Sequence, residues 1–345
     1  MASAVTHVAQ MDAPNPQLVW DTINAYQRTA ALGAAIDLDL FTAISEGANT
    51  PSDLAKRCDA SARGIRILCD YLTAIAFLAK TADAYSLTPT SAVFLDRHSP
   101  ACMSSMARFM NGPELMAGFD NLAATVRRGG TQLPQDGCNA VEYDGWVTFS
   151  ECMAPMMQAA SEFVAEEVAR HTGGAPLRVL DIAAGHGLFG IAVARRLPQA
   201  EIVAQDWATV LRTARKNAHS AGISTRYAEL PGDVFTVDLG SGYDVVLLTN
   251  LLHHFDRPAC VGLLQKIYAS LAPEGRLITL EFVPNEDRVT PPIPATFSLM
   301  MLGLTPGGDA YTGREHQDML RAAGFSGFRL VPVPQSPQHL IVSEK

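Results

Sequence analysis

The stretch from Leu177 to Gly190, LRVLDIAAGHGLFG, constrains the fold more than any other part of the chain. An apolar run ends near Asp181 and is followed by three closely spaced glycines, Gly185, Gly187 and Gly190. This order predicts a buried strand, a tight turn and the start of a helix, which is how a doubly wound α/β domain opens its ligand crevice.

Strands and helices alternate regularly after this turn. The pattern predicts strands at 201–206, 225–228, 244–249 and 276–282, with helices at 208–220 and 258–271. The segments 328–333 and 339–342, which a proline turn separates, predict a closing hairpin. A terminal antiparallel hairpin is unlike the repeated halves of a dinucleotide-binding dehydrogenase and fits a methyltransferase sheet.

The glycines by themselves do not identify the ligand, because they also match the GxGxxG pattern of dinucleotide-binding folds, with Asp206 roughly 20 residues further on. Asp181 argues against a dinucleotide, since a carboxylate beside the turn repels a pyrophosphate. S-adenosylmethionine carries an ammonium and a sulfonium and no phosphate, so an acidic neighbour favours it. A turn that merely joins a strand to a helix is the alternative.

Further candidates for a cofactor site follow in chain order. Asp206 ends the second strand, where a carboxylate can accept both ribose hydroxyls of an adenosine. Trp207 and Phe235 are expected to lie against the adenine ring, and Asp233 in the GDVF turn to accept its amino group. Taken singly, each of these residues also has a purely structural explanation as a helix cap or a turn residue.

The motif TNLLHHFD ends the fourth predicted strand at the crevice, where we expect Asn250 to contact the cofactor and take His253 and His254 as the catalytic candidates. An imidazole is a suitable proton acceptor at neutral pH for a phenol. Adjacent histidines point in different directions, so we expect one of them, His253, to act on the substrate and a metal site to be absent. Glu281, which ends the fifth strand, is expected to hydrogen-bond an imidazole; a solvated rim carboxylate is the alternative.

Apolar side chains in two other segments are candidates for an acceptor pocket. A long helix from Gly145 carries Trp146, Phe149, Met153 and Met157 at helical spacing, which suits either core packing or one wall of a flat pocket. The proline-rich stretch 283–312 is expected to be an inserted loop with an apolar turn at 297–304, in which Phe297, Met300 and Met301 would contact the acceptor.

The N-terminal third predicts helices with a broad apolar surface. This surface includes Leu18, Trp20, Ile23 and Tyr26. We expect these side chains to be buried against a second subunit or against another part of the same chain. The stretch 50–91 has a winged helix-turn-helix pattern, with the wing expected at 84–91, and 106–128 is expected to form another helical segment. Only two arginines would face DNA, so packing and dimerisation are favoured.

Composition narrows the classes of protein. The chain has 345 residues and a formal net charge of −9, which disfavours nucleic acid as a partner. Six scattered cysteines without a C-x-x-C pair favour reduced thiols and the cytoplasm. Neither a signal peptide nor a membrane span is expected, because no apolar run of the necessary length occurs.

The order VLDIAAGHG, AQDW, GDVF, LLHHFD and LEFV, after a winged-helix module, resembles the S-adenosylmethionine-dependent small-molecule O-methyltransferases. The resemblance implies a seven-stranded class I methyltransferase sheet and an N-terminal dimerisation domain at 12–105, with a helical linker at 106–170 and the catalytic domain at 171–345. It also implies a homodimer and S-adenosylhomocysteine as the product.

The same resemblance assigns roles to individual residues. Asp181, Gly185 and Gly187 would line the methionine end of the cofactor, and His253 would be the general base with Glu281 beside it. The chain departs from plant members at His254, where they carry an aspartate, and at Ala310, near which they carry a second glutamate. C-methylation and a ligand-responsive winged-helix regulator are the alternative functions.

Overall fold

The computed structural model describes residues 14–170 and 176–345, which form two compact units, one ending at Asn111 and the other spanning Gly112–Lys345. Most of the segment expected as a linker, from Gly112 onwards, belongs to the same unit as the sheet.

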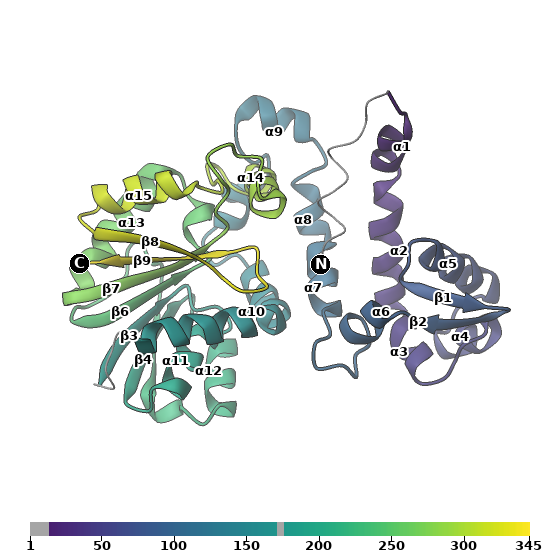
Figure 1. The fold of residues 1–345 in the computed structure, drawn as a ribbon, viewed down its shortest axis with the longest axis horizontal. Helices are drawn as coiled ribbons and strands as arrows, with labels where there is room; N and C mark the ends of the chain where they lie inside the picture. Colours follow the sequence, from purple (N-terminus) through teal and green to yellow (C-terminus); the bar gives the residue numbers. More distant parts are fainter. Residues whose placement is uncertain (1–13, 171–175) are drawn as a thin grey trace. The chain divides into compact units, whose positions relative to one another are not determined.

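The first unit is mainly helical (Figure 1). Its elements are α1 Gln17–Ile23, α2 Ala25–Asp37, α3 Leu40–Ser45, α4 Pro51–Arg57, α5 Ala62–Ala74, β1 Leu78–Thr81, β2 Ala84–Leu87, α6 Pro89–Phe94 and α7 Ser104–Met110. Thr50 and Ser61 cap α4 and α5 by accepting backbone N–H groups, and Leu40, Leu54 and Leu72 lie in the core.

The predicted wing was partly wrong. The partner of β2 is β1, which precedes it, and the two strands pair antiparallel from Leu78↔Leu87 to Thr81↔Ala84. The residues expected as a wing turn begin helix α6 instead, because Thr88 caps it and Pro89 stands in its first turn, where the missing N–H costs nothing.

Helix α1 buries none of its residues within the first unit. Leu18, Trp20 and Ile23 are 57–65% exposed, and Tyr26 at the start of α2 is 68% exposed. A contiguous apolar surface of this kind marks an interaction site.

The expected single helical segment at 106–128 is broken into three helices. These are α7, α8 Pro113–Ala117 and α9 Leu122–Arg128. The backbone is extended at Gly112 because Pro113 disfavours the helical conformation in the residue before it, and Asn121 starts α9 by capping it. The 3₁₀-helix η1 Pro134–Asn139 and the long helix α10 Gly145–Arg170 follow.

The second unit contains a seven-stranded sheet in the order β5-β4-β3-β6-β7-β9-β8. Its strands are β3 Leu177–Ile182, β4 Ala200–Asp206, β5 Tyr227–Pro231, β6 Tyr243–Thr249, β7 Leu271–Glu281, β8 Ser326–Pro332 and β9 His339–Glu344. The first five are parallel, and β9 and β8 form the antiparallel hairpin that the sequence predicts. This is the class I methyltransferase fold.

Helices cover both faces of the sheet (Figure 1). Helix α11 Leu188–Arg196 and α10 bury one apolar cluster, and α13 Arg257–Ser270 and α15 Gly313–Ala322 bury another. Helix α12 Leu211–Ser220 starts three residues later than expected, and the second unit also contains the short 3₁₀-helices η2 Ser224–Arg226 and η3 Leu252–His254.

The stretch expected as an inserted loop contains a helix, α14 Pro292–Leu304. Two prolines occupy its first turn, where the N–H groups have no partner within a helix, so they start the helix and do not break it. In the part of the chain that the model covers, no helix is long and apolar enough to cross a membrane.

Candidate active site at the carboxyl edge of the sheet

The glycine turn between β3 and α11 has the geometry of a ligand cradle. Ala183, Gly185 and Gly187 all have positive φ angles, of 51°, 56° and 75°. Asp206, at the end of β4, holds this turn, because its Oδ2 accepts a hydrogen bond from Gly185 N at 2.8 Å and its Oδ1 accepts one from Trp207 N at 2.7 Å.

Asp181 lies beneath the turn and not on its surface. Its side chain is 0% exposed, and its Oδ2 accepts a hydrogen bond from Gly190 N at 2.9 Å. Oδ1 has no hydrogen-bond partner among the described residues. Burial raises the pKa of Asp181 to about 7, the Gly190 N–H opposes this, and the charge of Asp206 adds to it. The Asp181 side chain therefore has no exposed surface at the turn and contacts it through the backbone N–H of Gly190.

Asp233 and Phe235 lie in the turn that follows β5. Asp233 Oδ1 accepts a hydrogen bond from Phe235 N at 2.9 Å, and the Phe235 ring is 37% exposed with its partner Phe255 edge-on at 4.8 Å. This turn thus presents a carboxylate and an accessible aromatic face.

These groups fit an adenosine ligand without phosphates. Carboxylates of Asp206 and Asp233 are acceptors for hydroxyl and amino groups, and burial raises the pKa of Asp206 to about 6, against the hydrogen bonds from Gly185 and Trp207. A cationic ligand stabilises the ionised form of such a carboxyl group. These acceptor groups therefore suit S-adenosylmethionine better than a pyrophosphate.

His253 and Glu281 form a buried pair. His253 Nδ1 lies 2.5 Å from Glu281 Oε2, and the two side chains are 6% and 1% exposed. Glu281 Oε1 accepts hydrogen bonds from Leu251 N at 3.1 Å and Leu252 N at 2.9 Å. The carboxylate thus fixes the imidazole and the loop that carries it, as expected from the sequence.

The electrostatics of Glu281 follow from these contacts. Burial alone would raise the pKa of the Glu281 carboxyl, but the charge and hydrogen bond of His253, helped by His316 and the Leu252 N–H, outweigh it, and the pKa lies below its usual value. The Nε2 atom of His253 makes no hydrogen bond within the described part of the chain. That nitrogen is available to an acceptor molecule.

His254 belongs to a different cluster. Its Nδ1 lies 3.6 Å from Cys138 Sγ, its carbonyl accepts a hydrogen bond from Asn139 Nδ2 at 2.7 Å, and its ring lies 5.0 Å from that of Trp146. Burial first and then the charge of His253 keep the pKa of His254 well below its usual value. His254 is therefore neutral, and Cys138 and Asn139, which no motif marks, are part of the site.

Aromatic side chains surround the base. Phe297 lies edge-on to His253 with ring centroids 4.9 Å apart, and it stacks on Phe282 at 4.2 Å. Phe149 lies edge-on to Trp146 at 5.5 Å. The predicted pocket residues from α10 and α14 thus approach the two histidines from separate segments.

The methionines predicted for the pocket divide into two groups. Met153, Met157 and Met300 are half-buried, whereas Met301 is 1% exposed and lies in the interior, so it is a packing residue. Asn250, expected at the cofactor, has a φ of 56°; its Nδ2 lies 4.0 Å from Met157 Sδ, and its Oδ1 accepts a hydrogen bond from Gln338 Nε2. Gln338, in the hairpin turn, was not predicted.

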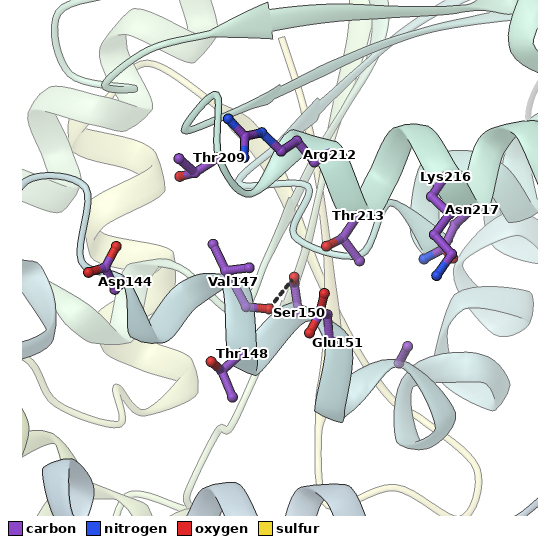
Figure 2. A pocket seen from close by; sticks show the side chains of 11 residues that line it. Asp144, Val147, Thr148, Ser150, Glu151, Thr209, Arg212, Thr213, Lys216 and Asn217 are labelled. Atoms are coloured by element: carbon purple, nitrogen blue, oxygen red, sulfur yellow. Dashed lines mark hydrogen bonds between the residues drawn. The ribbon is translucent and has the colours of Figure 1, made fainter.

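An open cavity of about 900 Å³ lies between α10 and α12. Figure 2 shows side chains of Glu151 and Thr213 among those that line it. Asn217, another lining residue, donates a hydrogen bond from Nδ2 to His186 O in the glycine turn at 2.9 Å. None of the predicted site residues lines this cavity.

Comparison with known families decides the assignment. Residues 119–326 match the model of the O-methyltransferase domain, and residues 20–97 match that of the O-methyltransferase dimerisation domain. The chain belongs to the O-methyltransferase family. It is an S-adenosylmethionine-dependent enzyme.

The chain is similar along nearly its whole length to characterised enzymes. It is 27% identical over 326 residues to 3-hydroxy-5-methyl-1-naphthoate 3-O-methyltransferase of Streptomyces sahachiroi, covering 92% of this chain and 91% of the relative. It is 26% identical to acetylserotonin O-methyltransferase of Mus musculus, covering 94% and 87%.

Solved structures share the fold. A crystal structure of a candidate O-methyltransferase from Nostoc punctiforme PCC 73102 is 47% identical, with a TM-score of 0.93, and covers 96% of this chain and 100% of the other. The structure of PigF with S-adenosylhomocysteine is 26% identical, with a TM-score of 0.84, and covers 96% and 100%.

Proposed function

We propose that this O-methyltransferase methylates a hydroxyl group of an aromatic or polyketide-like small molecule, with His253 as general base. The buried His253–Glu281 pair carries the proposal, since its imidazole keeps one nitrogen unpartnered within the described chain and faces Phe297. The naphthoate enzyme above and a tetracenomycin 8-O-methyltransferase of Streptomyces glaucescens, 25% identical over 327 residues, act on acceptors of this class.

The geometry of the pair supports a role for each residue. Glu281 Oε2 accepts a hydrogen bond from His253 Nδ1–H, which leaves Nε2 of His253 as the basic nitrogen. Nε2 removes the proton of the acceptor hydroxyl, and the ionised Glu281 stabilises the imidazolium that results. The bound S-adenosylmethionine supplies an electrophilic methyl group. The flat faces of Phe297 and Trp146 suit a planar acceptor.

Residues at the glycine turn hold the cofactor in this proposal. Gly185 and Gly187 shape the backbone, Asp206 accepts from the ribose hydroxyls, and Asp233 and Phe235 hold the adenine. Support comes from the exposed Phe235 ring and from the carboxyl groups whose ionisation a cationic ligand favours.

We also propose that the protein is a cytoplasmic homodimer. Support comes from the exposed apolar residues of α1, of which Trp20 and Ile23 lie within the match to the dimerisation domain. All six cysteines are free thiols, which fits a reducing compartment. Changing Trp20 and Ile23 to serine should convert the dimer to a monomer, measured by light scattering after gel filtration; a dimer that persists would contradict this assembly.

The function is tested with the His253→Ala variant. Turnover of a phenolic acceptor, chosen from a panel of naphthols and hydroxylated polyketides, should fall about 10²- to 10⁴-fold at pH 7 and recover in part at high pH, where the phenol ionises. The control is His219→Ala, because His219 is exposed on α12. A His253→Ala variant as active as the wild type would remove His253 from the mechanism.

Calorimetry tests the cofactor separately from the base. The wild type and His253→Ala should both bind S-adenosylmethionine at micromolar concentrations, since His253 is not among the residues assigned to the cofactor. Absence of binding in the wild type would contradict the enzyme assignment.

A further inference from the structure

Two polar atoms beneath the glycine turn are buried without a partner. Tyr227 Oη and Asp181 Oδ1 make no hydrogen bond among the described residues. Buried hydroxyl and carboxyl oxygens nearly always have a hydrogen-bond partner, because an unsatisfied one costs about 1–3 kcal/mol. Two such atoms close together are therefore expected to share a hydrogen-bond partner.

The strand register brings the two side chains to the same face of the sheet. Asp181 pairs with Ala204, and Ala204 pairs with Glu229, so these three side chains share a row and a face. Tyr227 precedes Glu229 by two residues in β5 and therefore points to the same face. Ala204 has only a methyl group, which leaves room between Asp181 and β5.

The tyrosine ring fills this room and reaches the turn. It packs against a small cluster that contains Ala184, Ala204 and Ala214. A Cβ atom at Gly187 would lie 2.6 Å from Tyr227 Oη, closer than real contacts allow. The hydroxyl therefore lies directly below the backbone that the cofactor contacts, and residue 187 must be glycine both for its φ angle and for this approach.

Charged groups surround the hydroxyl. Burial, and then the charges of Asp181, Glu229 and Asp206, raise the pKa of Tyr227 well above its usual value, so it remains a neutral donor. Glu229 is already paired with Arg215, with oxygen–nitrogen distances of 2.5 and 2.6 Å. Asp181 is the carboxylate whose second oxygen lacks a donor.

We propose that Tyr227 is a positioning residue for the cofactor turn, and that its hydroxyl supports Asp181 through one internal water that hydrogen-bonds both Oη and Oδ1. A single water satisfies both buried atoms. Asp181 in turn holds Gly190 N at the start of α11, so the tyrosine determines where the turn lies and how readily Asp181 ionises. The inference rests on the assignment of this turn to S-adenosylmethionine.

The test measures cofactor binding and not turnover. In Tyr227→Phe, which keeps the ring, the dissociation constant for S-adenosylmethionine at pH 7.5 should rise about tenfold, because the ionised carboxylate loses its donor. The acid limb of the affinity–pH profile should shift to higher pH. Besides Asp181, the charged groups near this hydroxyl are Asp206 and Glu229, and Glu229 is paired with Arg215. His186, in the turn itself, is neutral because burial lowers its pKa to about 4.

A double-mutant cycle separates positioning from packing. The effect of Tyr227→Phe should disappear in an Asp181→Asn background, since the two residues act through one contact. The control Tyr243→Phe removes a hydroxyl from another buried tyrosine of the sheet, distant from the turn, and should leave affinity unchanged. A crystal structure should show the bridging water.

Two results would overturn the proposal. One is a Tyr227→Phe variant that loses thermal stability but keeps the wild-type affinity and pH profile, which would make the residue purely structural. The other is an effect that persists unchanged in the Asp181→Asn background. If the wild type itself bound no cofactor, the assignment of the turn and not the role of Tyr227 would be wrong.

Discussion

Two buried carboxylates at the same edge of the sheet have opposite surroundings. Glu281 accepts two backbone hydrogen bonds at one oxygen and pairs with His253 at the other. Asp181 accepts one hydrogen bond, from Gly190 N, and its other oxygen has no partner among the described residues. Both are almost fully buried, at 1% and 0% exposure.

The difference appears in their ionisation. Burial opposes charge at both sites, but the contacts of Glu281 outweigh it and lower the pKa of that carboxyl, whereas the pKa of Asp181 rises to about 7. The charge and hydrogen bond of His253 make the main difference, because they act at Glu281 and have no counterpart at Asp181. A cationic ligand near Asp181 would favour its ionised form in the same way.

Removal of the fully satisfied carboxylate should have the largest effect. In Glu281→Ala, the imidazole and two N–H groups lose their acceptor, so turnover should fall about 10²- to 10⁴-fold and the free energy of unfolding by about 3–5 kcal/mol. Turnover and urea unfolding measure this, with the exposed Glu274→Ala as control. If Glu281→Ala kept the wild-type turnover, the proposed difference between Glu281 and Asp181 would be wrong.

Removal of the charge at the other carboxylate should stabilise the ligand-free protein. Because the folded pKa of Asp181 exceeds the ordinary aspartate value of 3.8, the native state binds more protons than the unfolded state between about pH 4 and 7, and its free energy of unfolding falls as pH rises through that window. A shift from 3.8 to about 7 corresponds to about 4 kcal/mol at most. Urea unfolding of Asp181→Asn should show a weaker decline between pH 5 and 8; an unchanged slope would contradict the raised pKa.

The sign is reversed for Glu281. Its folded pKa is lowered, so its contribution is present above the unfolded pKa and is lost as pH falls through the folded value, below about pH 4.5. The two carboxylates should therefore be distinguishable in one curve of unfolding free energy against pH. Glu281→Gln should remove the pH dependence below about pH 4.5, and Asp181→Asn should weaken the pH dependence near neutral pH.

Cofactor affinity should change with pH by about tenfold, which is a smaller effect than those expected above. S-adenosylmethionine should bind more tightly as pH rises from about 5.5 to 7.5, because Asp181 and Asp206 ionise in this range. S-adenosylhomocysteine, which lacks the sulfonium charge, is the matched control and should show a flatter profile. Equal slopes for the two ligands would mean that neither carboxylate responds to the methyl donor.

The smallest effect is expected at His254. Since burial holds its pKa well below its usual value, His254 is neutral across the working range, and His254→Asn should leave the shape of the pH–rate profile unchanged. Turnover should change by only about threefold. A shifted acid limb would show that His254, and not the His253–Glu281 pair alone, titrates during catalysis.

The sequence predicted the sheet because its signals are local. Apolar runs such as that of β3 end in a polar residue and a glycine turn, and the observed strand bounds lie within a few residues of the expected ones. Prolines were the source of the errors. Pro113 interrupts the segment expected as one helix because it starts a new helix, α8, and Pro292 starts α14 where a loop was expected. In both cases the proline is the first helical residue and the residue before it is extended.

The site was predicted in part for the same reason. His253 and Glu281 were expected to meet because the ends of neighbouring parallel strands lie at one edge, and they lie in hydrogen-bond contact. Cys138 and Gln338 were missed because their contacts, to His254 and Asn250, span 116 and 88 residues and carry no motif. Their roles in binding stay predictions, as does that of His253.

Alone, the sequence determined which residues end the strands, and with them the polar groups that meet at the carboxyl edge. Only the tertiary structure decided how many donors each carboxylate has, because that number depends on segments far apart in the chain that converge after the sheet has formed. It therefore also decided that Asp181 lies under the turn and that Tyr227 reaches it. Hydrogen-bond partners and burial are properties of the folded chain, and they set the charge of both carboxylates.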